Sequence, residues 1–154
     1  MKQQNIIIRN AVYSDIDALV QLLKKLFAVE ADFSFDPDKH RQGLRLMIDG
    51  CGKHKCIKVA QIGGRIVGMC SAQTLISTVE GGVVAIVEDL VVQDRWQGKG
   101  VGRMLLDAIA SWSCVRQLKR LQLLADSENK PALAFYRKNS WKPTQLICLR
   151  KQFR

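Results

Sequence analysis

The sequence has no long hydrophobic run, no internal repeat and no low-complexity tract. A membrane span needs about 18 consecutive apolar residues, so we expect no segment of this chain to cross a bilayer. Charged residues make up 25% and hydrophobic residues 47% of the chain, a balance that excludes a disordered or fibrous protein. We therefore expect residues 1–154 to form one globular domain.

Cysteine is too irregular in number and spacing to form a disulfide framework. There are five cysteines, and a chain of 154 residues can build a core without covalent staples. This usage predicts free thiols in the reducing cytoplasm, and the first residues do not read as a secretory leader. Cys51, His54 and Cys56 offer three metal ligands without a suitable fourth, so we predict no metal site.

Acidic residues are scarce as well: 14 Asp and Glu stand against 24 Lys and Arg, which gives a net charge of +10. Such an excess indicates an anionic partner, namely nucleic acid, an anionic membrane or a polyphosphate ligand. Ten basic and two acidic residues lie between Arg116 and Arg154. A solvated basic face is the default interpretation of that cluster, and it contains no aromatic stacking motif for RNA.

Hydrophobic patterning predicts an α+β order of elements. Ser14 is the expected N-cap of the first helix, and Asp36 with Pro37 marks the start of the second. His40 is interpreted as a solvated residue of that second helix. The pattern predicts strands at 6–12, 57–62, 65–76, 83–92, 121–125 and 145–149, and helices through 16–27, 44–48, 104–112 and 132–138.

The segment 88–102 is the most informative part of the sequence. A buried strand runs into Gln97-Gly98-Lys99-Gly100-Val101-Gly102, and this turn opens a helix. Glycines allow successive N–H groups to converge, and the helix N-terminus adds partial positive charge, as do Arg95, Lys99 and Arg103. The spacing fits neither the dinucleotide fingerprint nor the ATP-binding loop. It predicts a pyrophosphate-binding turn, against the alternative of a turn that only reverses the chain.

Residues 97–102 fit the pattern [Gln/Arg]-x-x-Gly-x-[Gly/Ala], in which x is any residue. This pattern resembles the signature of the GNAT superfamily of acetyl-CoA-dependent N-acetyltransferases. Leu90-Val91-Val92 before the turn and residues 129–136 after it strengthen the resemblance, which covers almost the whole chain. It implies a single GNAT-like domain with a mixed, mostly antiparallel sheet of six to seven strands, flanked by about four helices.

The resemblance also implies how acetyl-CoA would bind. Main-chain N–H groups of the turn would hold the pyrophosphate, and the strand before it would bond pantetheine beside a bulge that opens a slot. The Val92 N–H would polarise the thioester carbonyl. The cofactor-binding residues implied in this way are Leu90, Val91, Val92, Gln97, Gly98, Lys99, Gly100, Val101, Gly102, Arg103 and Asn129.

The resemblance further implies an acid and a base. An alkylamine of pKa about 10.4 must lose a proton before it attacks a thioester. Glu88 and Asp89 are neighbours on the strand and should face opposite sides. The resemblance selects Asp89 as base, with Glu88 second, although either could simply pair with a basic residue. Tyr136 is the implied acid, or else a core aromatic. No cysteine lies in an activating motif, which favours direct attack in a ternary complex.

The acceptor is expected to lie against residues 32–38, between the first two helices. Acidic and aromatic groups there suit a small cationic amine, although a helix cap with a hydrophobic staple explains them equally. The alternatives are a protein or peptide amine, or a non-catalytic CoA-binding or RNA-associated module. The edge of the strand at 145–149 is compatible with a homodimer, whereas membrane and nucleic acid are disfavoured as partners.

Overall fold

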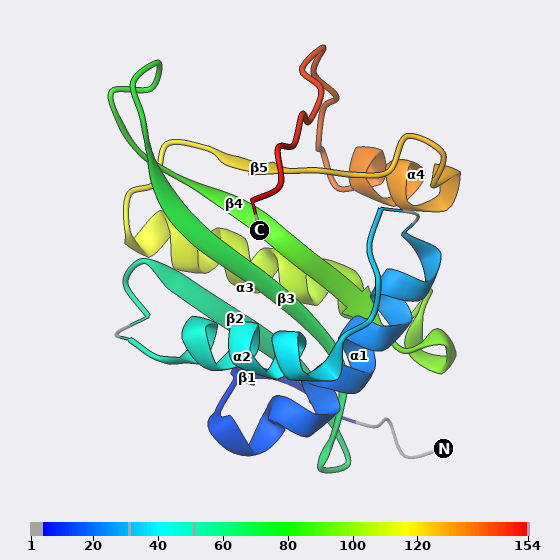
Figure 1. Cartoon of the computed structure of the whole chain (residues 1–154). Coiled ribbons are helices and arrows are strands. Elements are labelled where there is room, and N and C mark those ends of the chain that lie inside the picture. The colour runs from blue at the N-terminus through cyan, green and yellow to red at the C-terminus, as the bar shows by residue number, and fades with distance from the viewer. Residues whose placement is uncertain (1–4, 31, 51, 154) are drawn as a thin grey trace. The chain divides into compact units, whose positions relative to one another are not determined.

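The computed structural model describes residues 5–30, 32–50 and 52–153 (Figure 1). Contacts divide the chain into two compact units, Met1–Leu123 and Leu124–Arg154. The first holds the sheet and three helices, and the second holds one helix followed by extended chain. Among the described residues, no helix has the length and hydrophobicity that a bilayer span requires.

The sheet of the first unit has five strands in sequential order. They are β1 (Ile6–Asn10), β2 (Lys55–Ile62), β3 (Arg65–Ser77), β4 (Gly82–Val92) and β5 (Leu121–Leu123). The first four pair antiparallel, and β5 joins β4 in parallel. Gly63 and Gly64 form the turn between β2 and β3 with φ of 54° and 79°, values that favour glycine.

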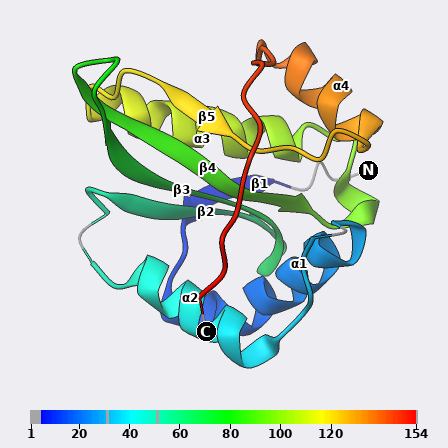
Figure 2. The same cartoon turned by 45° about the horizontal axis from the view of Figure 1, so that its top comes forward.

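Helices cover both faces of this sheet (Figure 2). α1 (Ile16–Val29) and α2 (Pro37–Ile48) lie on one side, over a core that includes Val59, Met69 and Val91. α3 (Val101–Val115) lies on the other side and approaches β3 closely at Gly68. A Cβ atom at Gly68 would come within 3.1 Å of the Leu105 side chain. The site-bearing end of β4 therefore lies between two packed layers.

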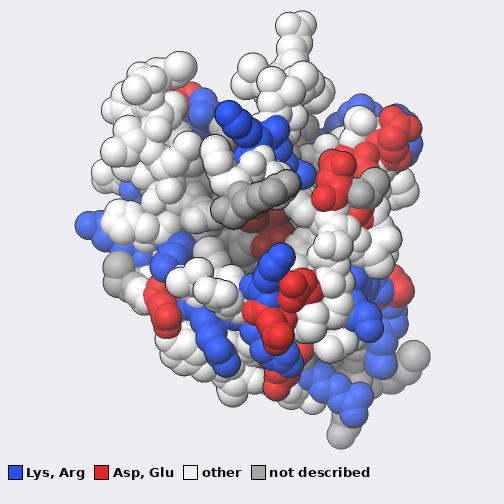
Figure 3. Space-filling view, in the orientation of Figure 1, with Lys and Arg blue, Asp and Glu red and all other residues white. Residues whose placement is uncertain are grey.

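The second helix begins as predicted. The Asp36 carboxylate accepts hydrogen bonds from the N–H groups of Asp38 at 3.1 Å and Lys39 at 3.2 Å, and Pro37 is the first helical residue. Acidic and basic side chains are mixed over this region (Figure 3). Ion pairs join Lys39 to Asp36 and Arg41 to Asp17. The surface of α2 therefore carries no field of a single sign.

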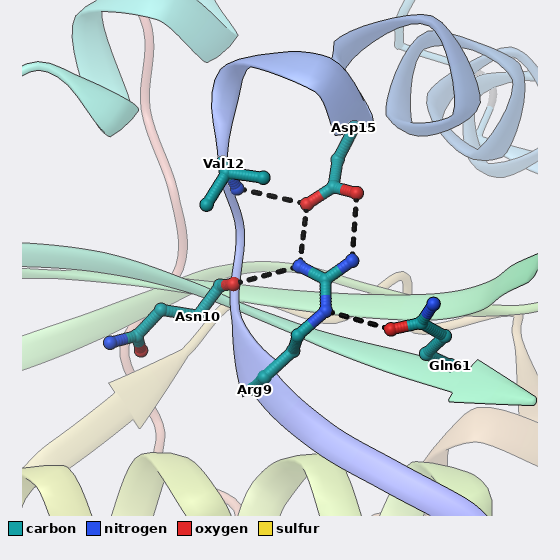
Figure 4. Close-up of polar contacts among 5 residues, drawn as sticks. All are labelled: Arg9, Asn10, Val12, Asp15 and Gln61. Carbon is teal, nitrogen blue, oxygen red and sulfur yellow. Dashed lines mark hydrogen bonds and ion pairs between the residues drawn. The ribbon is translucent and has the colours of Figure 1, made fainter. Parts of the chain in front are cut away.

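The prediction that Ser14 caps the first helix is wrong, because Ser14 lies within a 3₁₀ turn, Tyr13–Asp15, that precedes α1. The carboxylate of Asp15 takes the organising role instead (Figure 4). It accepts the Val12 N–H at 2.9 Å and two bonds from the Arg9 guanidinium at 2.8 and 2.9 Å. Arg9 holds the pKa of Asp15 below its usual value. Asp15 takes this role because Arg9 on β1 bonds its carboxylate, and the pattern of capping residues does not show that contact.

The expected sheet of six to seven strands is also wrong, since the described residues form five. The predicted strand at 145–149 is extended chain in the second unit, without strand pairing among the described residues. Its side chains Leu146, Ile147 and Leu149 are 80–87% exposed. An apolar extended sequence becomes a strand only where a neighbouring edge supplies N–H and C=O groups. The edge on which the homodimer expectation rested is therefore not formed.

Candidate active site

A β-bulge interrupts β4 where the candidate base lies. Val87 pairs with Ala72 and Leu90 pairs with Cys70, so that Glu88 and Asp89 both lie opposite the single residue between those partners. Such a bulge bends the strand and redirects a side chain. The bulge implied by the resemblance is thus present.

The bulge gives the two neighbouring carboxylates different surroundings. Glu88 is exposed, whereas Asp89 is partly buried. Asp89 Oδ2 accepts a hydrogen bond from the Ser71 hydroxyl at 2.7 Å, and the Asp89 N–H donates to the same oxygen at 3.2 Å. Ser71 itself is buried. Among the described residues, no ion pair joins Asp89 to a basic side chain.

The pKa of Asp89 lies above its ordinary value. Burial is the main cause, because it penalises the ionised form, and the charge of Glu88 acts in the same direction. The hydrogen bond from Ser71 lowers the pKa of Asp89 without cancelling the effect of burial. A carboxylate of raised pKa accepts a proton more readily, which suits a general base.

Beyond the bulge, β4 presents main-chain groups to an open edge. The Gln93 N–H donates to the Val67 carbonyl of β3 at 2.8 Å. Since alternate residues of an antiparallel strand point to opposite neighbours, Leu90 and Val92 direct their main-chain groups away from β3, and Val91 directs its own toward β3. The parallel strand β5 pairs with β4 only as far as Val87. Leu90 and Val92 therefore lack a strand partner on that side among the described residues.

The glycine turn follows directly, through a 3₁₀ turn at Asp94–Trp96. Gly98 and Gly100 have φ of 71° and 82°, the left-handed region that favours glycine, and a Cβ at either would meet no protein atom within 4 Å. Gln97 secures the turn to the strand, because its Nε2 donates to the Val92 carbonyl at 3.0 Å and its N–H donates to Asp94 at 3.1 Å.

The N–H groups of residues 98–103 donate no hydrogen bond within the described part of the chain. They include those that open α3, whose N-terminus carries partial positive charge. Arg95 and Lys99 lie over the Trp96 ring, 5.0 and 4.7 Å from its centre, and add full charges beside the turn. Arg103 extends from the first turn of α3 and pairs with Asp107 at 3.7 Å. This arrangement has the chemistry that suits an anion such as a pyrophosphate.

Two other residues implied by the resemblance belong to the second unit. Asn129 caps α4 (Lys130–Lys138), with its side-chain oxygen accepting the Ala132 N–H at 3.2 Å. Tyr136 lies on that helix, partly buried, with its ring 6.1 Å from that of Trp141. Asp89 and the glycine turn both lie in the first unit, whereas Asn129 and Tyr136 do not.

The buried thiols near the bulge are poor nucleophiles. Burial raises the pKa of Cys56 to about 11 and raises the pKa of Cys70 further, with the charge of Asp89 adding to the effect on Cys70. Cys51 of the considered metal cluster lies outside the described residues. Within those residues, no group of three metal-ligating side chains is found.

Sequence reasoning missed Ser71 and misjudged His40. Ser71 has no motif, and only the strand register places it opposite Asp89. His40 is partly buried rather than solvated: its Nε2 accepts the Asp36 N–H at 3.1 Å, and its ring contacts Phe27 and Phe35. Histidine four residues after the helix-capping aspartate was the available signal for that hydrogen bond.

The first unit thus combines a five-stranded α+β fold with a bulged strand that leads into a glycine turn suited to an anion. A model of the acetyltransferase (GNAT) family matches residues 16–141, and the chain belongs to this family. Enzymes of this family take the acetyl group from acetyl-CoA, which confirms acetyl-CoA as the cofactor. Comparison with curated protein sequences gives no match.

Solved structures confirm the fold. A transcriptional regulator from Bacillus halodurans C-125 has a TM-score of 0.83 at 22% identity, covering 97% of this chain and 100% of that one. The aminoglycoside N-acetyltransferase AAC(6')-Iy in complex with CoA has a TM-score of 0.83 at 15% identity, covering 98% and 97%. The aminoglycoside acetyltransferase meta-AAC0020 from an uncultured soil metagenomic sample has a TM-score of 0.77 at 22% identity, covering 97% of both chains.

Proposed function

We propose that residues 1–154 form a single N-acetyltransferase domain that moves the acetyl group of acetyl-CoA to a small primary amine, by direct attack in a ternary complex. The observation that carries this proposal is one continuous arrangement on β4 and α3. Asp89 with its raised pKa, the open edge at Leu90 and Val92, and the free N–H groups of residues 98–103 follow one another along the chain.

Residues of this arrangement have distinct roles in binding acetyl-CoA. The N–H groups of residues 98–103 hold the pyrophosphate, with Lys99 and Arg103 adding charge. Leu90 and Val92 bond the pantetheine amides as an additional strand would. The Val92 N–H donates to the thioester carbonyl oxygen and stabilises the negative charge that develops there.

Asp89 accepts a proton from the acceptor ammonium, directly or through water, and frees the nitrogen lone pair. The nitrogen then forms a bond to the thioester carbon, and the carbon–sulfur bond breaks. The resemblance assigns two further roles: Tyr136 donates its hydroxyl proton to the departing thiolate, and Asn129 contacts pantetheine. The raised pKa values of Cys56 and Cys70 support direct attack over an acyl-cysteine. The free thiols also suit a reducing cytoplasm.

Thermal unfolding with and without acetyl-CoA tests the binding site. A ligand at about 100 times its Kd stabilises the native state by about 2.7 kcal/mol, which raises Tm by about 5–11 °C for a chain of this size. Gly100→Glu should abolish the shift, because it places a carboxylate at the anion-binding turn. Gly63→Glu is the matched control, since Gly63 has φ of 54° and equally open surroundings in a different turn, the one between β2 and β3. An equal shift in both variants would contradict the assignment.

Release of the CoA thiol on addition of amines tests the transfer. We expect turnover that requires both acetyl-CoA and an amine. Binding of acetyl-CoA without turnover across a broad amine panel would contradict the enzymatic role and favour a binding module.

A further inference from the structure

Four aromatic rings form a continuous row on α1, α2 and the segment between them. The ring of Phe33 lies 5.3 Å from that of Phe27, Phe27 lies 4.9 Å from His40, and His40 lies 5.2 Å from Phe35. Phe27 and Phe35 pack against the core beneath the helices. Phe33 is 44% exposed. The row therefore runs from the core to the solvent.

The inner end of this row lies on the same side of the sheet as the candidate base. Residues two apart on a strand share a face, so Ser71 of β3 faces the same side as Met69, which packs in the core with Phe27 and Phe35. Ser71 holds the Asp89 carboxylate at 2.7 Å. The ring row and the group that takes the proton of the amine thus share one layer of the molecule.

The charged side chains around the row do not form a binding site for a molecule with several ammonium groups. Asp36 is occupied in capping α2 and pairs with Lys39 at 3.7 Å. Lys24 Nζ lies 5.6 Å from the centre of the Phe35 ring and places a positive charge on the row itself. Asp32 and Asp38 are exposed, where water screens an ion pair strongly. Figure 3 shows this mixture of signs over α2.

Resting on the proposed function, we infer that Phe27, Phe33, Phe35 and His40 form the acceptor-binding surface, and that they select a monoamine carried on an aromatic or flat apolar body. Such a body covers the rings by offset or edge-to-face contact while its ammonium group reaches Asp89. Polyamines and aminoglycosides bring several ammonium groups to a surface with Lys24 at its inner part, and they leave the rings uncovered.

The first test compares kcat/KM for phenethylamine, propylamine, spermidine and kanamycin at a fixed acetyl-CoA concentration. We expect phenethylamine to exceed spermidine and kanamycin by at least tenfold. A preference for spermidine or kanamycin would overturn this inference and leave the proposed function intact. Absence of transfer to every amine, with acetyl-CoA binding retained, would overturn the proposed function and this inference with it.

The second test replaces the outermost ring. Phe33→Ala should raise KM for phenethylamine by about three- to tenfold, and by at least threefold more than KM for propylamine, because the lost contact is with the aromatic body. Phe33→Trp should restore the low KM. The control is Leu46→Ala, which removes an exposed apolar side chain of α2 that is not part of the ring row. An equal effect of Phe33→Ala on both amines would refute selection by the rings.

Discussion

Replacing Ser71 by alanine removes a hydroxyl group that contacts Asp89 twice. That hydroxyl donates to the carboxylate at 2.7 Å and accepts the Asp89 N–H at 3.2 Å. Because Ser71 is 1% exposed, no solvent takes its place without rearrangement. We predict that Ser71→Ala lowers stability and raises the pKa of Asp89 further, since the bond favours the ionised carboxyl.

The size of the effect depends on the charge of Asp89. A hydrogen bond to an ionised group contributes about 1.5–3 kcal/mol, and one to a neutral group about 0.5–1.5 kcal/mol. Above the pKa of Asp89 the variant should therefore lose about 1.5–3 kcal/mol of unfolding free energy, or about 3–12 °C in Tm. Below that pKa the loss should be smaller by about 1 kcal/mol.

Urea denaturation between about pH 4 and pH 8 measures this difference without any acceptor. Ser113→Ala is the matched control, because Ser113 is also buried but its hydroxyl donates to the neutral Ile109 carbonyl of the same helix. Its loss of stability should not vary with pH. Once an acceptor is known, the acid limb of the kcat/KM profile should move to higher pH in Ser71→Ala. Identical, pH-independent losses in both variants would refute the coupling of Ser71 to Asp89.

Three further predictions use other parts of the chain. Asp89→Asn should lower kcat by at least about a hundredfold, because it removes the proposed base. The same variant should be more stable in urea at neutral pH, because the raised pKa of Asp89 gives stability that is present in acid and is lost as pH rises through that pKa. Tyr136→Phe should lower kcat in steady-state assays while the acetyl-CoA thermal shift persists; undiminished turnover would remove Tyr136 from the mechanism. Arg9→Ala should cost about 2 kcal/mol of unfolding free energy at neutral pH, and the loss should shrink in acid, because the lowered pKa of Asp15 gives stability that disappears as pH falls through it.

Local patterns were sufficient for much of the fold. The strands predicted at 57–62 and 65–76 are joined by the turn at Gly63 and Gly64, and Asp36 followed by proline predicted the start of α2. The glycine turn before α3 has the left-handed backbone that its composition indicated. In each case the residues that decide the conformation are adjacent in the chain, so the sequence contains the whole cause.

Contacts between different elements of the fold explain the remaining differences. The bond between Ser71 and Asp89 depends on a one-residue register shift that no periodicity reveals. Asp15 rather than Ser14 organises the start of α1 because Arg9 lies across from it. The segment 145–149 has the composition of a strand, but pairing requires an edge as well as composition.

Gly68 has a consequence for how accurately the anion-binding turn is held. A methyl group there would meet Leu105 and the Val91 carbonyl oxygen at 3.1 Å and the Val92 side chain at 3.3 Å. Leu105 belongs to the helix that begins at the turn, and Val92 carries the N–H that we propose for the thioester carbonyl. The absence of a side chain at Gly68 thus allows α3 to pack close to β3. In the proposed complex, this contact in the core fixes the spacing between the two ends of the acetyl donor, about 30 residues upstream of the glycine turn.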